Sequence, residues 1–446
     1  SKYCPLFNLI FFGLILILLP KAKLSKEHYI ELKVDGTGYQ EIISEKYGGI
    51  KPSAIYVNKE VQILRDRKVY VQSEGHIIKI EWDERINNFT YMFSDVTSIT
   101  YAKLHDISGN ACNMSYMFQN CYKLSDFVYD TSYIIAYGIL DTISMFHNCS
   151  SLITFSFNNL YLDEYCSNFR WYDDDINYDC RNKNNPYRNM SYMFYNCQNL
   201  KNISFPNDIK YVNDMTGMFY NCISLTSINL DRIITNKGQN QNANLSYMFY
   251  NCQQLSSIDL TKTMYVSDMN SMFYNCLSLP SICTKYFSSQ YYSYSYSYYY
   301  INASRLFYNC YKLNNIDGNF EYLYTKDARE MFYNCSSLEY NYYNDKSFQI
   351  RINNQNSNMD INMSSMFYNC RELKLIHIYS YSNNYLLPTD FHLMFYNCVS
   401  LTSLYFKYYN AHYAQNLSYM FYNCVELQHF EINCDDNSNS LIFLNL

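Results

Sequence analysis

The segment NMSYMFYNCQNLKNISF, residues 189–205, decides the fold because variants of it recur along the chain. A second clear copy, NLSYMFYNCQQLSSIDL, spans residues 244–260. In each copy the apolar residues first follow helical spacing, as at Met193, Phe194 and Cys197, and then alternate with polar residues as in a strand. Each copy is therefore predicted to form a helical turn followed by one strand.

The phenylalanine of this segment marks a repeat with a mean period of about 30 residues. It occurs at Phe93, Phe118, Phe146, Phe194, Phe219, Phe249, Phe273, Phe307, Phe332, Phe367, Phe395 and Phe421. One such unit cannot bury its own apolar face, whereas stacked units share a continuous core with a parallel sheet along one side. The sequence therefore predicts a solenoid of about twelve repeats, with loop insertions at residues 158–188, 284–301 and 339–361.

The repeat core MFYNC, followed by L-x-x-I-x-L, resembles the BspA-like leucine-rich repeats of bacterial and protist surface proteins over roughly residues 87–432. The stretch before it, residues 30–88, is similar to the β-rich leader that precedes such repeats in protist members. The resemblance implies an α/β leucine-rich-repeat solenoid at residues 87–446 behind an N-terminal β-rich capping domain at residues 25–86. It also implies a surface or secreted protein used in adhesion and recognition, without catalytic activity.

An apolar run, LFNLIFFGLILILL at residues 6–19, follows Lys2 and precedes Lys21 and Lys23. This layout is typical of a secretory signal, and its 14 residues fall short of the about 20 that a transmembrane helix needs. Three interpretations of residues 1–24 stay open: a targeting signal that is uncleaved or partly trimmed, a membrane anchor, or an apolar strand that buries itself in a neighbouring subunit. Each of them places the protein in or through the secretory route.

The composition is that of a folded chain, and its charge argues against one class of partner. The 446 residues include only 11 Gly and 7 Pro, which argues against a collagen-like or Pro/Gly-rich disordered chain. Lys and Arg number 34 against 40 Asp and Glu, so the net charge of −6 has the wrong sign for a protein that neutralises phosphates. We therefore expect no nucleic-acid partner.

Most of the 17 cysteines occupy one position of the repeat. Eleven follow the repeat phenylalanine by three residues: Cys121, Cys149, Cys197, Cys222, Cys252, Cys276, Cys310, Cys335, Cys370, Cys398 and Cys424. Without CxxC or Cys/His pairs, these are predicted to be small buried hydrophobes rather than metal ligands. Cys166 and Cys180 bracket the longest insertion and are predicted to form a loop-closing disulfide. Four others have no assigned role: Cys4, Cys112, Cys283 and Cys434.

Tyrosine, with 53 residues, is the other compositional anomaly, and it too follows the repeat. The residue after the repeat phenylalanine is tyrosine in nine of twelve units, from Tyr195 to Tyr422. Because the neighbouring Phe and Cys point inward, this tyrosine is expected to point outward and to form a column on the convex side. Stacking between units is favoured over ligand binding as its role. The alternating insertion YYSYSYSYYY, residues 291–300, is predicted to be a contact surface in a self-assembling protein.

Asn or Asp stands five residues before every repeat phenylalanine. The positions are Asn88, Asn113, Asp141, Asn189, Asp214, Asn244, Asp268, Asn302, Asp327, Asn362, Asp390 and Asn416. These side chains accept hydrogen bonds from free backbone amides and are preferred at helix N-termini, so a capping role is predicted.

The Asn members of this column are also candidate glycosylation sites. All seven have Ser or Thr two residues later, whereas among the five Asp members only Asp214 does. Capping alone does not predict that coupling, so N-linked glycans are predicted at Asn88, Asn113, Asn189, Asn244, Asn302, Asn362 and Asn416, and also at Asn202. Such glycans imply a eukaryotic secretory pathway. Asn148 and Asn334 match the same motif but precede the repeat cysteine, where they are expected to satisfy backbone groups between units and to stay bare.

The sequence carries no catalytic or cofactor motif, so we expect no enzyme activity and no cofactor other than covalent N-linked glycans. Asp173, Asp175, Asn177 and Asp179 follow the first ligand spacings of a calcium loop, but the Gly and the closing Glu are missing. A solvated acidic loop is therefore preferred to a metal site. The strand positions are expected to present a mixed polar face: Ser156, Ser204, Asn229, Asp259, His377, Tyr405 and Glu431.

Two functions fit these observations. The first is a non-enzymatic, N-glycosylated extracellular or cell-surface protein with a structural or adhesive role, which self-assembles into a filament or coat. Its contact surfaces would be the tyrosine rows, residues 1–24 and the apolar stretch at residues 441–446. The alternative is a monomeric recognition ectodomain that binds a glycan or a cell-surface protein through its concave sheet face.

Overall fold

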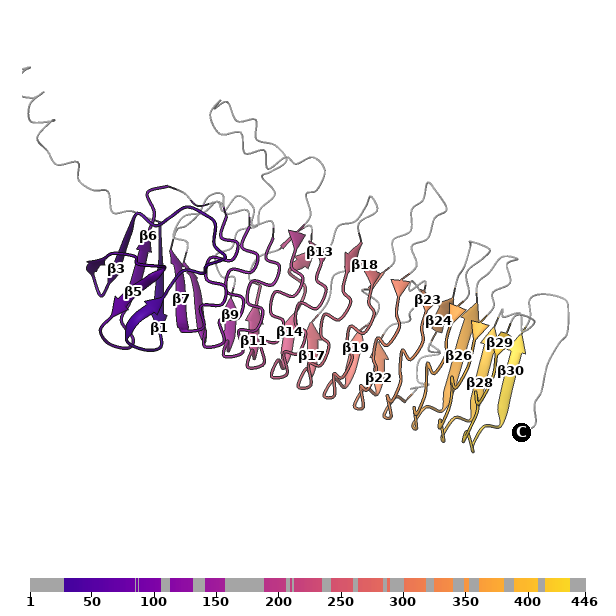
Figure 1. Cartoon of the computed structure of the whole chain (residues 1–446). Coiled ribbons are helices and arrows are strands. Elements are labelled where there is room, and N and C mark those ends of the chain that lie inside the picture. The colour runs from indigo at the N-terminus through magenta and orange to yellow at the C-terminus, as the bar shows by residue number, and fades with distance from the viewer. Residues whose placement is uncertain are drawn as a thin grey trace, which may run out of the picture.

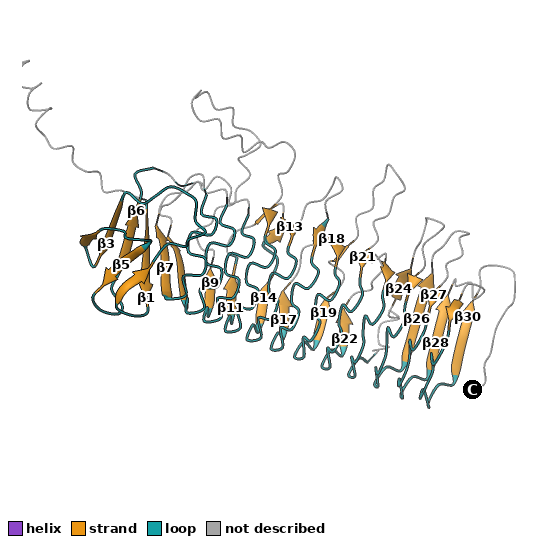
Figure 2. Cartoon of the chain, viewed as in Figure 1, coloured by secondary structure: helices purple, strands orange, loops and turns teal. Residues whose placement is uncertain are grey.

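The structure, a computed structural model, is an elongated stack of short strands and turns (Figure 1). It describes residues 28–433 except for residues 85, 87, 106–112, 131–140, 157–187, 206–208, 211, 235–241, 260–263, 284–286, 289–300, 318–324, 340–348, 353–360, 381–388 and 408–413. No helix occurs in this described part (Figure 2). The segment at residues 1–24 and most of the three predicted insertions lie outside it.

The N-terminal strands form a mostly antiparallel sheet that continues into the repeats. Its order is β4-β3-β6-β1-β7-β8, in which β1 is antiparallel to both β6 and β7, and β7 is parallel to β8. Beside it, β2 pairs with β5. The strands are β1 (Tyr29–Val34), β2 (Gly38–Glu41), β3 (Ala54–Val57), β4 (Glu60–Gln62), β5 (Lys68–Val71), β6 (Ile78–Glu81), β7 (Ile99–His105) and β8 (Asp126–Asp130). The predicted capping role and its bounds, residues 25–86, stay predictions.

Parallel strands follow in two separate rows along the stack (Figure 1). The first row, which we call the sheet wall, continues from β7 and β8 through β9 (Thr154–Ser156), β11 (Asn202–Ser204), β14 (Ser227–Asn229), β17 (Ser257–Asp259), β19 (Ser281–Cys283), β22 (Asn315–Asp317), β24 (Gln349–Ile352), β26 (Leu375–Ser380), β28 (Ser403–Lys407) and β30 (His429–Asn433). Hydrogen bonding along this wall is discontinuous: β9 pairs with β11, β14 with β17, β19 with β22, and β24, β26, β28 and β30 form one sheet.

The second row is one sheet of very short strands, each carrying an Asn or Asp of the predicted capping column at its C-terminal end. Its path runs through β10 (Arg188–Asn189), β13 (Val212–Asp214), β16 (Ala243–Asn244), β18 (Met264–Asp268), β21 (Ile301–Asn302), β23 (Thr325–Asp327), β25 (Ile361–Asn362), β27 (Thr389–Asp390) and β29 (Ala414–Asn416). In addition, β20 (Phe287–Ser288) pairs with β18, and β12 (Ile209–Lys210) pairs with β15 (Ile233–Ile234).

The segment predicted to be a helical turn is instead a run of tight turns, so the α/β assignment is wrong for the described residues. We call this segment, from the Asn or Asp to the leucine of each unit, the turn wall. In the unit at residues 189–205, the N–H groups of Phe194 and Asn196 donate to carbonyls of the next unit at 2.9 and 2.7 Å. The N–H groups of Tyr195 and Cys197, which alternate with them, donate within the unit to the carbonyl three residues back, both at 3.1 Å.

A helix is excluded because two positions in each unit have a positive φ. In one unit these are Tyr192 (+56°) and Asn196 (+61°), and in the next Gly217 takes the position of Tyr192. The left-handed conformation costs a residue with a side chain about 1–2 kcal/mol, which the hydrogen bond to the next unit offsets. The apolar side chains still face inward, so helical spacing alone did not distinguish turns from helix.

A continuous apolar core lies inside the stack. The repeat phenylalanines stack face to face, as at Phe219 and Phe249, whose ring centroids are 5.4 Å apart with planes within 4°. The Met, Leu and Cys positions of nearly every unit are also buried. Because each unit completes the core of its neighbours, the structure confirms a repeat-based fold.

Candidate functional site

An Asn/Asp ladder, which we call the Asx ladder, runs along the second row of strands. Its members pair in register from one unit to the next, as Asn189 does with Asp214 and Asp214 with Asn244. A side-chain oxygen accepts from the N–H two residues on, at 2.8 Å from Ser191 to Asn189 and at 3.0 Å from Ser246 to Asn244. This is an Asx-turn, so the predicted capping hydrogen bond exists but begins a turn rather than a helix.

The Asx ladder alternates between Asn and Asp over most of its length. Its order is Asn88, Asn113, Asp141, Asn189, Asp214, Asn244, Asp268, Asn302, Asp327, Asn362, Asp390 and Asn416, so the alternation begins at Asn113. Neighbouring strands lie about 4.8 Å apart, and like charges directly opposite one another are unfavourable. The order places a neutral carboxamide between successive carboxylates. Asn189, for example, contacts the carboxylates on both sides: its Nδ2 donates to Asp214 at 3.1 Å and its backbone N–H donates to Asp141 at 3.4 Å.

The predicted glycosylation sites fall in two places. Asn88, Asn113, Asn189, Asn244, Asn302, Asn362 and Asn416 belong to the Asx ladder and are half-buried or exposed, whereas Asn202 is exposed on β11. In Asn244 the side-chain oxygen accepts from both the N–H and the hydroxyl of Ser246. The amide nitrogen, to which an N-linked sugar is joined, takes no part in that turn. Glycosylation itself stays a prediction.

A second ladder, which we call the amide ladder, is formed by the Asn before each repeat cysteine. Each Nδ2 donates to the Oδ1 of the preceding unit, as from Asn221 to Asn196 at 2.6 Å. The ladder ends at Asp95, which takes the Asn position in the first unit and accepts from Asn120 at 2.6 Å. A carboxylate suits this end because it only accepts. Lys46, from the N-terminal strands and loops, pairs with Asp95 at 2.7 Å.

Asn148 and Asn334 belong to the amide ladder. Their Nδ2 atoms donate to Asn120 at 2.8 Å and to Asn309 at 2.8 Å, and their φ angles are +64° and +60°. Both features favour Asn, which tolerates the left-handed region. A sugar on either nitrogen would occupy the ladder, which supports the prediction that they stay bare. Their side chains bond the asparagine side chains of the neighbouring units, however, and not the backbone groups that were predicted.

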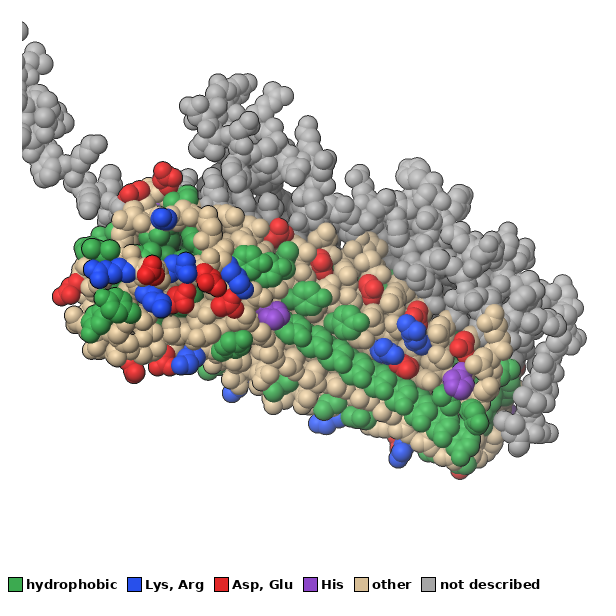
Figure 3. Space-filling view, in the orientation of Figure 1, with side chains coloured by type: hydrophobic (Ala, Val, Ile, Leu, Met, Phe, Trp, Pro, Cys, Tyr) green, Lys and Arg blue, Asp and Glu red, His purple; other side chains and the backbone are tan. Residues whose placement is uncertain are grey.

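The predicted tyrosine column is confirmed as a continuous stack. It begins at His147, whose ring lies 4.5 Å from that of Tyr195, and the following rings are 4.4–4.7 Å apart as far as Tyr422. Figure 3 shows an apolar stripe along this face. Burial raises the pKa of Tyr250 to about 12, so its phenol is neutral at physiological pH. Because the ring faces contact one another, only edges and hydroxyls remain for other partners.

The repeat cysteines are confirmed as free thiols, buried in every described unit except the last. The thiol of each donates to the carbonyl of the repeat phenylalanine in the preceding unit, as from Cys222 to Phe194 at 3.1 Å. Burial raises the pKa of the Cys222 thiol well above its usual range. Since the thiolate is the nucleophile and the metal ligand, this column is chemically inert. Cys424, in the last described unit, is less buried, and burial raises its pKa to about 11.

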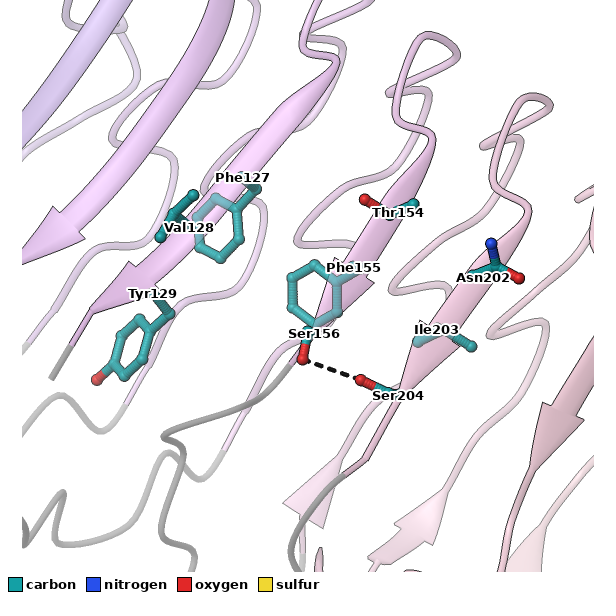
Figure 4. A pocket seen from close by; sticks show the side chains of 9 residues that line it. All are labelled: Phe127, Val128, Tyr129, Thr154, Phe155, Ser156, Asn202, Ile203 and Ser204. Atoms are coloured by element: carbon teal, nitrogen blue, oxygen red, sulfur yellow. Dashed lines mark hydrogen bonds between the residues drawn. The ribbon is translucent and has the colours of Figure 1, made fainter.

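The sheet wall carries a pocket of about 350 Å³ where its hydrogen bonding is interrupted between β8 and β9 (Figure 4). Outward side chains of Thr154, Ser156 and Asn202 line it together with the inward rings of Phe127 and Phe155. Such a mixture is expected where a seam in a sheet opens toward the core. Further along, the predicted polar face is present, with His377 and Tyr405 paired in register and their rings 4.7 Å apart.

Within the described ranges, no three His, Cys, Asp or Glu side chains come together as a metal site would require. No helix among those residues is long and apolar enough to span a membrane. The calcium candidate at residues 173–179 and the predicted disulfide between Cys166 and Cys180 lie outside the described residues, so both stay predictions.

Comparison with known families agrees with this geometry. The family described as BspA type leucine rich repeat region (6 copies) matches residues 115–245, 190–302 and 240–353, which together cover more than half of the chain. The chain belongs to the BspA-type leucine-rich-repeat family. A second family, described as Mycoplasma protein of unknown function, DUF285, matches residues 336–433 of this BspA-type chain. No curated protein matches the chain. Leucine-rich-repeat families are generally non-enzymatic.

Two features of this BspA-type chain were not predicted from the sequence: the alternation of Asn and Asp along the Asx ladder and the pocket in the sheet wall. The Asn/Asp alternation was present in the column of residues but was interpreted only as capping and glycosylation. The pocket had a weaker signal, because it depends on how β8 and β9 separate rather than on any motif.

Proposed function

We propose that the chain is a non-enzymatic extracellular or cell-surface protein with a structural or adhesive role, which self-assembles into a filament or coat. The observation that carries this proposal is the stack of in-register ladders along the repeats: one of rings, one of amides and one of alternating Asn and Asp. Such a stack is a stiff rod with the same surface on every unit, which suits repeated contacts. Family membership supports a surface or secreted location.

We further propose that the rod carries N-linked glycans at the Asn members of the Asx ladder. The coupling of Asn, but not Asp, to Ser or Thr two residues later supports this assignment. Because Asn and Asp alternate from Asn113 onward, the sugars would occupy every second unit there, about 10 Å apart, along one side of the rod. The tyrosine column would stay free of them.

The decisive experiment is negative-stain electron microscopy of the native protein together with glycopeptide mass spectrometry of the same sample. Filaments are expected, with sugar at Asn113, Asn189 and Asn244. Deleting residues 1–24, or replacing the tyrosines of residues 291–300 by Ser, is expected to abolish the filaments. Unchanged assembly after both edits would refute this contact scheme, and bare asparagines would leave the Asx ladder with a structural role only.

The alternative is a monomeric recognition ectodomain whose sheet wall binds a glycan or a surface protein. The pocket between β8 and β9 and the His377–Tyr405 pair on the same wall favour it. In that case His377→Ala and Tyr405→Ala should weaken ligand binding while the protein stays a single curved particle. Filaments that both variants leave intact, with no ligand bound, would favour the structural role.

A further inference from the structure

The pocket in the sheet wall has a chemistry that selects one class of ligand. Among the described residues that line it, none carries an ionised side chain. A charged ligand would lose its hydration there without gaining a counter-charge. Hydroxyl groups of Thr154, Ser156 and Ser204 and the amide of Asn202 line the pocket instead. These groups both donate and accept hydrogen bonds, as sugar hydroxyls do.

The polar groups also exclude a purely apolar ligand, which would leave them buried without partners. Ser204 donates to Ser156 at 2.9 Å, and Figure 4 shows this contact between β9 and β11. The side chains of Thr154 and Asn202 have no hydrogen-bond partner among the described residues and are exposed, so they are available to a ligand. The rings of Phe127 and Phe155 are buried and stacked 5.5 Å apart beneath the pocket. Val128, which is 40% exposed, offers an apolar contact that the CH groups of a sugar ring can cover.

We propose that this pocket binds a neutral saccharide unit. Its volume of about 350 Å³ lies at the lower end of the range for small-ligand sites, about 300–1,000 Å³, which suits one or two sugar rings. Nine of the described residues, on β8, β9 and β11, line it, so the site requires three successive units.

The saccharide can come from two sources. Asn202 lines the pocket and begins the motif Asn202-Ile203-Ser204, so the first sugar of a glycan on Asn202 would lie against Thr154 and Ser156. This source rests on the proposed N-glycosylation. The second source is a free or cell-surface saccharide, and it requires only that Asn202 be bare.

The first experiment uses the full chain made in bacteria, where Asn202 is bare. Titration with N-acetylglucosamine, chitobiose and maltotriose is expected to show saturable binding of at least one, with a Kd of about 1 mM or lower. Galacturonate and glucosamine serve as charged probes and should bind at least tenfold more weakly. Thr154→Val, which keeps the side-chain shape and removes the hydroxyl, should weaken binding about tenfold. Ser257→Ala, on the exposed face of β17 outside the pocket, is the matched control and should have no effect.

The second experiment distinguishes the two sources. The same chain is made in a eukaryotic secretory host and trimmed to one sugar per site with an endoglycosidase. If Asn202 carries its own sugar in the pocket, free saccharide no longer binds, and Thr154→Val lowers the melting temperature of the glycosylated form more than that of the bare form. If Asn202 is bare, binding of free saccharide persists.

Failure of this proposal is distinguishable from failure of the proposed function. The proposal is overturned if no neutral probe binds the bacterial protein at about 10 mM, if only the charged probes bind, or if Ser257→Ala weakens binding as much as Thr154→Val. None of these outcomes affects filaments or sugars at Asn189 and Asn244, which are measured separately.

Discussion

Asn244 stands between Asp214 and Asp268 in the Asx ladder, and its amide keeps two carboxylates on separate rungs. Asn244→Asp would place three carboxylates on consecutive strands while preserving the Asx-turn, because Asp accepts the same hydrogen bond. We expect this variant to lower the free energy of unfolding at pH 7 by about 1–2 kcal/mol. Denaturant unfolding of the bacterially made protein measures the change without interference from a lost glycan.

The matched control is Asp268→Asn, which leaves three neutral side chains in a row and should change stability by less than about 0.5 kcal/mol. The loss in Asn244→Asp should also shrink at pH 3, where the carboxylates are protonated. Equal effects of the two variants at pH 7 would show that the alternation has no electrostatic basis.

His147 begins the tyrosine column and makes it sensitive to pH. Burial lowers the pKa of this imidazole, and its Nδ1 has no hydrogen-bond partner among the described residues. The folded protein therefore favours the neutral ring, so its contribution to stability is present above the unfolded pKa of about 6.5 and is lost as pH falls through the folded pKa. We expect the melting temperature to fall between pH 7.5 and 5.

His147→Tyr continues the column with the residue found in the next nine units. It should reduce the drop in melting temperature at low pH while keeping the stacking contact with Tyr195. A drop of the same size in the variant would assign the acid sensitivity to other groups. Thermal melts of both proteins across the pH range make the comparison.

At the scale of one unit, the sequence predicted which residues face inward but not the backbone that carries them. Met193, Phe194 and Cys197 are buried as expected. Their spacing fits both a helix and the observed turns, so the choice depended on Tyr192 and Asn196, whose positive φ no apolar pattern reveals. The recurring Asn before Cys was the available signal, because Asn is enriched in the left-handed region.

Asn309, in the middle of the amide ladder, tests this explanation. It accepts from Asn334 at 2.8 Å, donates to Asn275 at 2.9 Å and has a φ of +61°. Asn309→Ala loses both hydrogen bonds and strains the backbone, so we expect a loss of about 2–3 kcal/mol. Asn309→Gly loses the bonds without the strain and should be about 1 kcal/mol less damaging.

The two variants are compared by chemical denaturation, with Asn309→Gln as a third. Gln keeps an amide but has a longer side chain, so it should resemble Ala rather than wild type. If Gly were as damaging as Ala, the left-handed backbone would not explain why Asn occupies this position.

At the scale of the whole molecule, the sequence predicted the stack of units but not the direction of the backbone hydrogen bonds between them. The stacked phenylalanines, cysteines and tyrosines followed from the period alone, since each recurs once per unit. The seam between β8 and β9 did not follow, because it depends on where strands pair rather than on which residues recur. The same holds for the backbone hydrogen bonds that join successive units between the Asx ladder and the amide ladder, which run toward the following unit.

Between the Asx ladder and the amide ladder, alternate N–H groups of the turn wall donate toward the following unit, as from Phe395 to Met420. The first unit faces the N-terminal strands and loops, where Ser44 donates to the carbonyl of Met92 at 2.9 Å. The last described unit has no following unit in the described part, and its Tyr419 and Tyr422 are 64% and 54% exposed. Among the described residues, the stack is therefore covered at its first unit and uncovered at its last.

Hydrogen exchange should reveal this polarity. The N–H groups of Tyr419, Phe421 and Asn423 have no partner among the described residues, whereas their equivalents in the preceding unit donate to the next. We expect the last unit to exchange fastest and protection to rise toward the middle of the stack, because opening one unit exposes the next. Mass spectrometry of peptides from residues 416–433 and 268–283 makes the comparison. Equal protection of the two would mean that the last turn wall is covered in solution, and mutation of Tyr422 would then locate the covering surface.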